Sequence, residues 1–325
     1  MHSLRAALCT ALALAALAVP ACAAPFAYIT NQGSHDVSVI DLASERVVAT
    51  VPVGRSPAGV AAASRIARVF VSNPDSKTLS VIDMRSQRVV DTWPAGSGPV
   101  GIAASADGQW LYVADWYANR LLIYATAGAG RAEPAIALGQ APAGVAVHDN
   151  GRLVFVAERD DDSVAVIDTR ERRVRARVRV GSHPFALLHD AARERLYALN
   201  VQSNDVSVVD TRDADRPAVI ATVAVGKAPY GAALAMAGSL LYITNQHEDS
   251  VSVIDTATLR LLRTLPGFAY PEGVAAHGDK VYVVNWMDDN VSVLDAASGR
   301  TLAQVATGSN SRGFGAFIGA PEATP

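Results

Sequence analysis

The stretch Leu241–Asp255, LYITNQHEDSVSVID, decides the fold because the chain repeats it. An alternating apolar segment ends at Asn245, a polar turn follows, and a second alternating segment ends at Asp255. Similar segments begin at Tyr28, Phe70, Phe155, Tyr197 and Tyr282, and a more divergent one begins at Tyr112. Successive copies are about 42 residues apart, and a fixed period of that length is typical of a repeat architecture.

One repeat unit, residues 58–96, divides into four short strand-forming segments. The pattern predicts strands over 59–63, 68–73, 78–83 and 88–94. The first segment holds small residues, which suit the crowded axis of a ring, and the others hold larger β-branched residues that pack between units. After residue 24, no long 3.6-residue period indicates a helical repeat. The sequence therefore predicts an all-β fold, a seven-bladed β-propeller with four strands in each blade.

The turns between units support this prediction. A Gly-x-x-Pro-x-Gly motif precedes the innermost strand at Gly54–Gly59, Gly96–Gly101, Gly139–Gly144 and Gly226–Gly231. Proline fixes φ in the turn, and glycine leaves space where the blades approach one another. We expect Asx-turns at the Asn or Asp that ends the second strand and at the Asp that ends the third.

The two ends of the chain each supply part of one blade. Residues 26–30 correspond to a second strand without a first strand before it, and residues 313–318 correspond to a first strand with nothing after it. We expect these segments to pair and close the ring, which removes free sheet edges that promote aggregation. The expected domain is a single propeller over residues 25–319, followed by a disordered tail over 320–325.

Residues 1–24 have the pattern of an export signal, with Arg5 before an apolar segment over 6–19 and a cleavage site near Ala23. The apolar segment is too short for a membrane-spanning helix. We expect a periplasmic or secreted protein, and the alternative is a lipid anchor at Cys22. Cleavage removes Cys9 and Cys22, the two cysteines of the chain. The exported form then has no disulfide, thiolate metal site or c-type haem attachment.

Composition and motifs narrow the functional classes. The formal net charge is −3 and 18% of the residues are charged, so no global field favours nucleic acid or an anionic membrane. A Gly-x-Ser-x-Gly nucleophile motif and a phosphate-binding loop are both absent from the sequence. We therefore expect a monomeric binding protein without enzymatic activity and without a cofactor.

The repeats resemble those of a known family. The segments Tyr28–Asn31 and Tyr242–Asn245 (YITN), Val37–Asp41 and Val251–Asp255 (VSVID), and Thr50–Gly54 (TVPVG) are similar to the YVTN β-propeller repeat of exported bacterial proteins. The resemblance covers essentially the whole chain after residue 24 and implies a seven-bladed ring. It implies little about activity, because related propellers include binding proteins, surface-layer components and parts of quinone or haem d1 enzymes.

Loops that lead into the innermost strands of a propeller lie on the same face as loops that link the second and third strands. Here those loops carry Arg55, Trp116, Arg159, His183, Phe185, Tyr230, His247, Tyr270, Glu272, Trp286 and Arg312. Aromatic and Arg side chains dominate the binding energy of many interfaces. We therefore expect a partner protein or small ligand to bind these residues at one mouth of the central channel. For Phe185 and Tyr230, packing is an equally good interpretation.

The histidines give no metal-binding pattern. His183, His247 and Glu272 are the candidates on the loop face, but no His-x-His or His-x3-His spacing fixes two ligands on one element. We expect them to be turn residues and predict no metal site. His148, His189 and His277, which end innermost strands, are expected on the opposite face.

A run of arginines lies between residues 170 and 179, where Arg alternates with apolar residues on an expected outermost strand. One side of this strand should pack on its blade while the other faces solvent. Charged side chains at a sheet edge prevent pairing with another molecule, and this is the interpretation we favour. A basic patch for an anionic surface is the alternative.

Two other functions stay open. An enzyme or accessory protein of a quinone- or haem d1-dependent redox system would use His183, Glu272 and Arg312 at the channel mouth. A single-stranded nucleic acid would stack its bases on aromatic residues beside Arg55, Arg159 and Arg312. The acidic balance of the chain disfavours the second of these functions.

Overall fold

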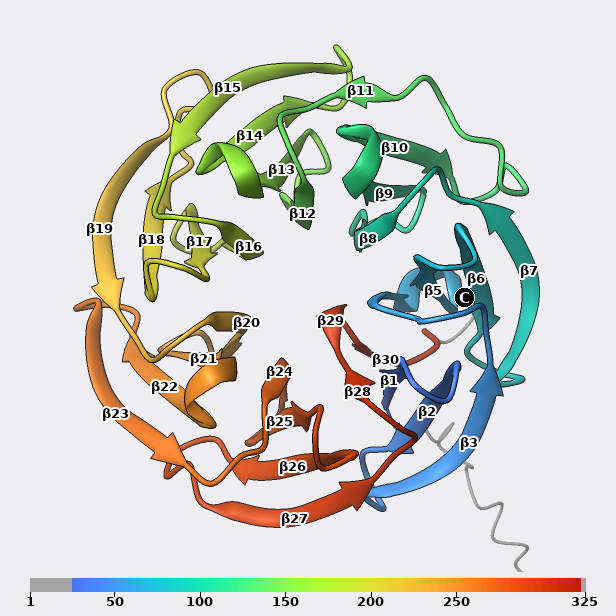
Figure 1. Ribbon diagram of the computed structural model, residues 1–325, viewed down its shortest axis with the longest axis vertical. Helices are drawn as coiled ribbons and strands as arrows, with labels where there is room; N and C mark the ends of the chain where they lie inside the picture. Colours follow the sequence, from blue (N-terminus) through green and yellow to red (C-terminus); the bar gives the residue numbers. More distant parts are fainter. Residues whose placement is uncertain (1–24, 323–325) are drawn as a thin grey trace, which may run out of the picture.

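The computed structural model describes residues 25–322 as seven β-sheets arranged in a ring around a central channel (Figure 1). The expected export signal with Cys9 and Cys22, and residues 323–325, lie outside the described residues. Within 25–322 no helix is long and apolar enough to cross a membrane. The helices described there are four single turns: η1 (Ser64–Ile66), η2 (Trp116–Ala118), η3 (Arg159–Asp161) and η4 (Gln246–Glu248).

Each blade runs outward from the channel, and the blades follow one another around the ring. Blade 2 contains β4 (Gly59–Ala63), β5 (Arg68–Asn73), β6 (Thr78–Asp83) and β7 (Arg88–Pro94), as the repeat predicts. Blade 3 contains β8 (Pro99–Ala104), β9 (Trp110–Asp115), β10 (Arg120–Ala125) and β11 (Ile136–Ala137). Blade 4 contains β12 (Pro142–Val147), β13 (Leu153–Glu158), β14 (Ser163–Asp168) and β15 (Arg173–Arg179).

The remaining blades have the same antiparallel order. Blade 5 contains β16 (Pro184–Asp190), β17 (Arg195–Asn200), β18 (Asp205–Asp210) and β19 (Ala218–Ala224). Blade 6 contains β20 (Pro229–Ala235), β21 (Leu240–Asn245), β22 (Ser250–Asp255) and β23 (Arg260–Pro266). Blade 7 contains β24 (Pro271–His277), β25 (Lys280–Asn285), β26 (Asn290–Asp295) and β27 (Thr301–Ala306). Blade 1 contains β1 (Phe26–Asn31), β2 (Asp36–Asp41) and β3 (Arg46–Pro52).

The burial of each strand follows its place in the blade. The second and third strands are buried on both faces because the neighbouring blades cover them, as in β21 and β22. The outermost strands are mostly exposed, and β23 has no fully buried residue. The repeated YITN and VSVID segments therefore supply the packing between blades.

The C-terminal segment closes the ring, with a register that differs from the expected one. The short strands β28 (Ser311–Arg312) and β30 (Ile318–Gly319) pair with β1 and complete blade 1. Between them, β29 (Phe314–Ala316) leaves β1 and runs parallel to β4 of blade 2. We expected one continuous strand over 313–318 beside residues 26–30. Glycine makes the departure possible, because Gly315 adopts a φ of +118°.

The closing segment also joins two blades. Tyr28 donates its backbone N–H to the Phe317 carbonyl of the same segment at 2.8 Å, and the Phe317 ring is fully buried. Beyond β30, Ala320 donates its backbone N–H to the Ser64 hydroxyl and Glu322 donates to the Ser64 carbonyl. The described part of the expected tail is therefore attached to blade 2.

Glycine in the inter-blade turns is required by close contacts, as predicted. A Cβ on Gly101 would lie 1.9 Å from the Ala143 carbonyl oxygen of the next innermost strand. A Cβ on Gly54, the first glycine of its motif, would lie 2.6 Å from the side chain of Asn73. Both distances are shorter than real carbon contacts, so the Ala143 backbone and the Asn73 side chain can come this close only to a glycine.

The two predicted sets of polar turn residues have different roles. Asp255, which ends a third strand, accepts hydrogen bonds from the Ala257 and Thr258 backbone N–H groups, as an Asx-turn requires. Asn245, which ends a second strand, does not form the expected turn. Its Nδ2 donates to the hydroxyls of Ser250 and Ser252 on the next strand. It is fully buried, so its side chain ties two strands together.

Candidate functional site

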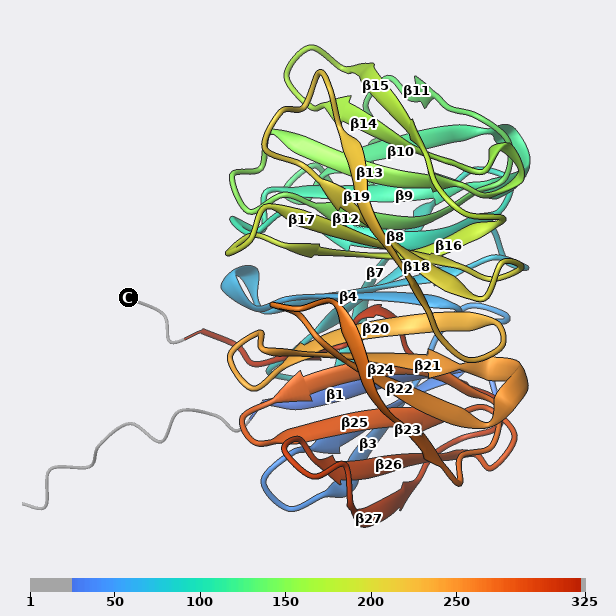
Figure 2. The same cartoon turned by 90° about the vertical axis from the view of Figure 1, so that its left-hand side faces the viewer.

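The loop face is the surface formed by the loops that lead into the innermost strands and by those that link the second and third strands. It lies on the right in Figure 2, where η4 (orange) projects, and the described ends of the chain lie on the left. The predicted site residues occur on this face, but they do not form one cluster. One group is buried at the channel axis, a second forms a more exposed row further out, and the remaining residues are held by separate local contacts.

The buried group fills the channel mouth, and we call Phe185, Tyr230 and Phe314 the aromatic plug. The ring centroid of Phe185 lies 4.6 Å from that of Tyr230 and 4.8 Å from that of Phe314. These residues come from β16, β20 and β29, so three blades contribute. All three are buried, and Trp116 packs on Phe185 with a centroid distance of 6.2 Å. Phe185 and Tyr230 therefore pack inside the channel mouth.

One repeat position accounts for two of the three plug residues, Phe185 and Tyr230. It is the residue after the proline that leads into each innermost strand. Across blades 2 to 7 it is occupied by Ala58, Val100, Ala143, Phe185, Tyr230 and Glu272. Small residues in the first three blades leave the space that larger residues from the other three occupy. Aligning the repeats therefore gives a sequence signal for these two plug residues, but not for Phe314.

An ion pair lies beside the plug. The Arg312 Nε lies 2.8 Å from Glu272 Oε2, and the Arg312 NH2 group donates to Glu272 Oε1 at 3.0 Å. Glu272 is 1% exposed and also accepts a hydrogen bond from Gln246 at 2.8 Å. Burial raises the pKa of the Glu272 carboxyl, while Arg312 and Gln246 favour its ionised form. Each charge of this pair therefore has a protein partner.

The second group is a row of three residues, His247, Tyr270 and Trp286, which we call the rim row. The ring of Tyr270 lies between the other two, at centroid distances of 5.5 Å from His247 and 5.4 Å from Trp286. The His247 Nε2 is 3.2 Å from the Tyr270 hydroxyl. Each residue comes from a different loop of blades 6 and 7, and none is fully buried. The predicted aromatic residues therefore do meet here.

The other predicted residues are held by local contacts. The Arg159 guanidinium lies 5.6 Å from the Trp116 ring centroid and forms an ion pair with Asp160. The exposed Arg55 donates to the Asp75 carbonyl at 3.2 Å. The His183 ring lies between two carboxylates, 3.8 Å from Asp160 and 3.9 Å from Asp162. Arg159 and Arg312 each have an acidic partner, Asp160 and Glu272. The geometry therefore gives little support to binding of nucleic acid phosphates by these arginines.

The loop face also carries two highly exposed apolar side chains. Tyr117 is 77% exposed and Met287 is 62% exposed, the highest values for large hydrophobic residues within 25–322. Tyr117 follows Trp116 in η2 of blade 3, and Met287 follows Trp286 in the loop after β25 of blade 7. Sequence reasoning missed Met287, because an isolated methionine in a turn has no distinguishing pattern.

The channel contains a cavity of about 590 Å³ behind the plug. Phe314 and Glu272 lie at its inner end, and the exposed Arg65, Ala106 and Glu322 lie at the other. The cavity therefore opens on the face opposite the loop face. Most of its lining comes from the innermost strands and consists of Ala, Gly, Val and Leu. We expected an accessible mouth on the loop face, but the aromatic plug fills the channel there.

The arginine run on the outermost strand of blade 4 is largely paired with carboxylates. Arg175 forms an ion pair with Asp215, Arg177 lies 2.8 Å from Glu158, and Arg172 lies 3.1 Å from Glu133. The apolar Val178, between Arg177 and Arg179, is buried against the blade. These contacts agree with the edge interpretation and weaken the alternative of a basic patch.

Sequence comparison gives the family of this ring. The model of the YNCE-like β-propeller family matches residues 61–152 and 132–322. The chain belongs to the YNCE-like β-propeller family. No curated protein matches it significantly.

Solved structures share the fold of this YNCE-like propeller. Hydrazine synthase of Kuenenia stuttgartiensis is 20% identical with a TM-score of 0.73, over 88% of this chain and 99% of that one. A functionally unknown protein from Desulfotomaculum acetoxidans is 16% identical with a TM-score of 0.75, over 91% and 99%. Dihydro-heme d1 dehydrogenase NirN, in complex with DHE, is 14% identical with a TM-score of 0.68, over 89% and 74%. At these identities the likeness concerns the fold alone.

Proposed function

We propose that this YNCE-like propeller is an exported, non-catalytic protein that binds a partner protein on its loop face. The proposal of export rests on the sequence of residues 1–24. The observation that carries the binding proposal is the position of Tyr117 and Met287. The two most exposed large apolar side chains of the described chain both lie on this face, each beside a tryptophan.

The arrangement favours a macromolecule over a small ligand at this face. Tyr117 belongs to blade 3 and Met287 to blade 7, which lie across the ring from each other (Figure 1). The aromatic plug fills the channel mouth between them. A ligand that contacts both Tyr117 and Met287 must therefore extend across a channel mouth that the aromatic plug fills. Exposed aromatic and methionine side chains on a rigid scaffold are typical anchors of protein interfaces.

The proposal is tested with exposed residues, whose replacement does not disturb the core. The variant Tyr117→Ala/Met287→Ala and the control Val48→Ala/Val90→Ala, which changes exposed residues of β3 and β7, are each immobilised and exposed to a periplasmic extract. We expect a protein that is retained by the wild type and by the control to be lost with the first variant. Retention of the same proteins by all three would overturn the proposal.

The cavity supports a second candidate, a small apolar ligand that enters from the opposite face. A volume of about 590 Å³ with an aliphatic lining is in the range of small-molecule sites. Binding of the apolar dye Nile red should fall when Ala103→Phe reduces the cavity, and should be unaffected by Tyr117→Ala/Met287→Ala. Equal dye binding by all variants would count against this site.

The redox alternative has less support from the geometry. Of its three expected residues, Glu272 and Arg312 neutralise each other, and His183 is placed between acidic side chains. NirN and hydrazine synthase share the fold with this chain at 14% and 20% identity, which carries no reaction over to it.

A further inference from the structure

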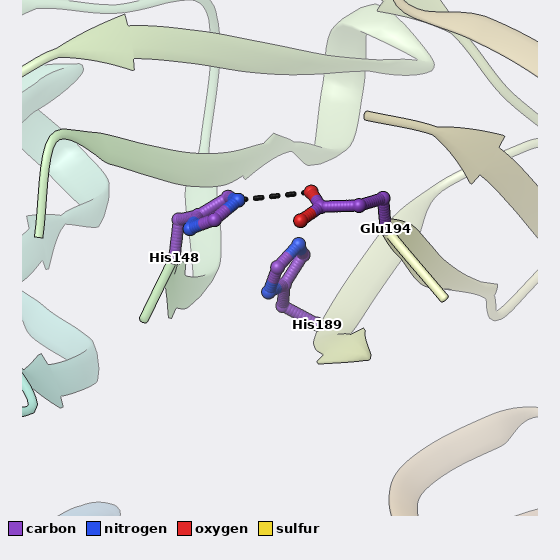
Figure 3. A group of neighbouring side chains, drawn as sticks. All are labelled: His148, His189 and Glu194. Carbon is purple, nitrogen blue, oxygen red and sulfur yellow. Dashed lines mark hydrogen bonds and ion pairs between the residues drawn. The ribbon is translucent and has the colours of Figure 1, made fainter. Parts of the chain in front are cut away.

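Three ligand-type side chains meet on the face opposite the loop face. His148, His189 and Glu194 each offer one ligand atom, and these atoms all lie within 4.8 Å of one another. They form the one such group of three in residues 25–322. In Figure 3, one ring nitrogen of each histidine is directed toward the Glu194 carboxylate. The sequence predicted that both histidines lie on this face but gave no reason for them to meet.

The group spans the interface between two blades. His148 follows β12 of blade 4, whereas His189 lies in β16 and Glu194 lies in the turn after β16 of blade 5. The His148 and His189 rings are in contact, with a centroid distance of 4.5 Å. The ring of Phe155 stacks on His189 at 5.4 Å and fixes its orientation from blade 4. Packing therefore holds the histidines together before any ion binds.

His189 departs from its repeat. It also lines the channel cavity. The same position in the other innermost strands of blades 2 to 7 is occupied by Ala62, Ala104, Val147, Leu234 and Ala276. An aliphatic residue at this position is therefore sufficient for folding. The few polar contacts of the His189 ring do not explain why a histidine is present here. Its Nε2 lies 3.3 Å from the Thr211 hydroxyl, and its buried Nδ1 has no hydrogen-bond partner among the described residues.

We propose that His148, His189 and Glu194 bind one divalent transition-metal ion, with Zn²⁺ as the best match. Two imidazole nitrogens and one carboxylate oxygen are a ligand set that proteins use for zinc, and three protein ligands leave a fourth position for water or a solute. Because His189 lines the cavity, the ion would lie at the cavity rim. This site is independent of the loop face and of the function proposed for it.

The three ligand atoms, which now lie within 4.8 Å of one another, must move closer together to bind one zinc ion. Zinc–nitrogen and zinc–oxygen bonds of about 2.0–2.2 Å place neighbouring ligand atoms about 3.0–3.6 Å apart. His148 Nε2 and Glu194 Oε2 are already 3.0 Å apart. The Nδ1 of His148 accepts the Asn150 backbone N–H at 3.2 Å, so Nε2 carries the proton in this arrangement. Metal binding at Nε2 moves that proton to Nδ1 and gives up the Asn150 contact.

Electrostatics favour a cation at this position. The carboxylates of Asp149 and Asp190 add negative charge nearby. The competing interpretation is that His148 and Glu194 form only a structural ion pair between blades, without a metal.

The chain offers a matched control for the test. His277 occupies in blade 7 the repeat position of His148 and is exposed on the same face, outside the group. Untagged protein is stripped with EDTA and titrated with Zn²⁺ by calorimetry, and Co²⁺ absorption reports the coordination. We expect about one ion per wild-type chain, a rise in melting temperature with Zn²⁺, and the same result for His277→Ala.

The variants His189→Leu and Glu194→Gln should each weaken Zn²⁺ binding at least about tenfold and abolish the rise in melting temperature. Leu is already present at the His189 position in blade 6, and Glu194 lies in a turn, so one variant remains informative if the other does not fold. Absence of Zn²⁺ binding by the wild type, or wild-type affinity in both variants, would overturn the proposal and leave the structural ion pair. Loss of binding in His277→Ala would do the same.

Discussion

At the scale of single residues, the ion pair of Glu272 and Arg312 illustrates how the ring departs from its own repeat. The equivalents of Glu272 in blades 2 to 4 are small apolar residues, so the fold does not need a carboxylate there. Once Glu272 is buried, however, its charge requires a partner, and Arg312 supplies it at 2.8 Å from the C-terminal segment. The pair therefore couples blade 7 to the closure of blade 1.

Removal of one partner should cost more than removal of both. Glu272→Ala leaves the Arg312 guanidinium next to the plug without its carboxylate, and we expect the free energy of unfolding to fall by about 3–5 kcal/mol in urea titrations. The double variant Glu272→Leu/Arg312→Met should recover a large part of this loss, because apolar replacements of a buried pair are often nearly neutral. A double variant as unstable as Glu272→Ala would show that the pair is not the cause.

The sequence predicted the candidate site on the loop face only in part. The sequence indicated which side chains belong to the loop face, since the turn motifs fix which loops share a face. It also separated Tyr230, which follows the proline before its innermost strand and for which packing was an equally good interpretation, from Tyr270, which precedes that proline. It did not show that the Tyr230 ring meets Phe185 and Phe314, or that the Tyr270 ring lies between His247 and Trp286. These contacts join residues from different loops and blades, and no local pattern describes them.

At the scale of elements, the third strand and its turn form the most regular part of the blade. Asp255 ends β22 and accepts hydrogen bonds from the Thr258 backbone N–H at 2.7 Å and from the Thr258 hydroxyl at 2.7 Å. These hydrogen bonds lower the pKa of the Asp255 carboxyl below its ordinary value of 3.8. Asp41 and Asp295 have the same contacts and the same direction of shift in other blades. The ionised form therefore stabilises the turn.

The expected pH dependence follows from the direction of this shift. Because the folded-state pKa is depressed, the stabilisation is present above pH 3.8 and is lost as the pH falls through the folded-state pKa. Asp255→Asn removes the charge but keeps an acceptor oxygen. We expect its melting temperature to lie below that of the wild type at pH 7, with a difference that shrinks as the pH is lowered beyond 3.8. A constant difference from pH 7 to pH 2 would contradict this account.

At the scale of the whole molecule, closure of the ring depends on a segment that pairs with two blades. β28 and β30 complete blade 1, while β29 pairs with β4 and carries Phe314 into the plug. Phe317 of the same segment is fully buried in the core shared by blades 1, 2 and 7. Loss of this segment would expose the edges of β1 and β4 and open the channel mouth.

Truncation tests this role. A chain that ends at Asn310 should lose cooperative thermal unfolding and aggregate, as measured by circular dichroism and size-exclusion chromatography. A chain that lacks only residues 323–325 serves as the control and should behave as the full chain does. A monomeric, cooperatively unfolding product from the first truncation would contradict the proposed closure.

The sequence by itself determined the repeat, the strand boundaries of blade 2 and the completion of one blade by both termini. These follow from alternation, turn residues and the repeat period, all of which are local properties. Only the tertiary structure decided that Phe185, Tyr230 and Phe314 fill one end of the channel, that the cavity opens at the other, and that His148 meets His189 and Glu194. The physical reason is that these contacts join side chains from different blades, and their distances depend on how the blades pack around the axis.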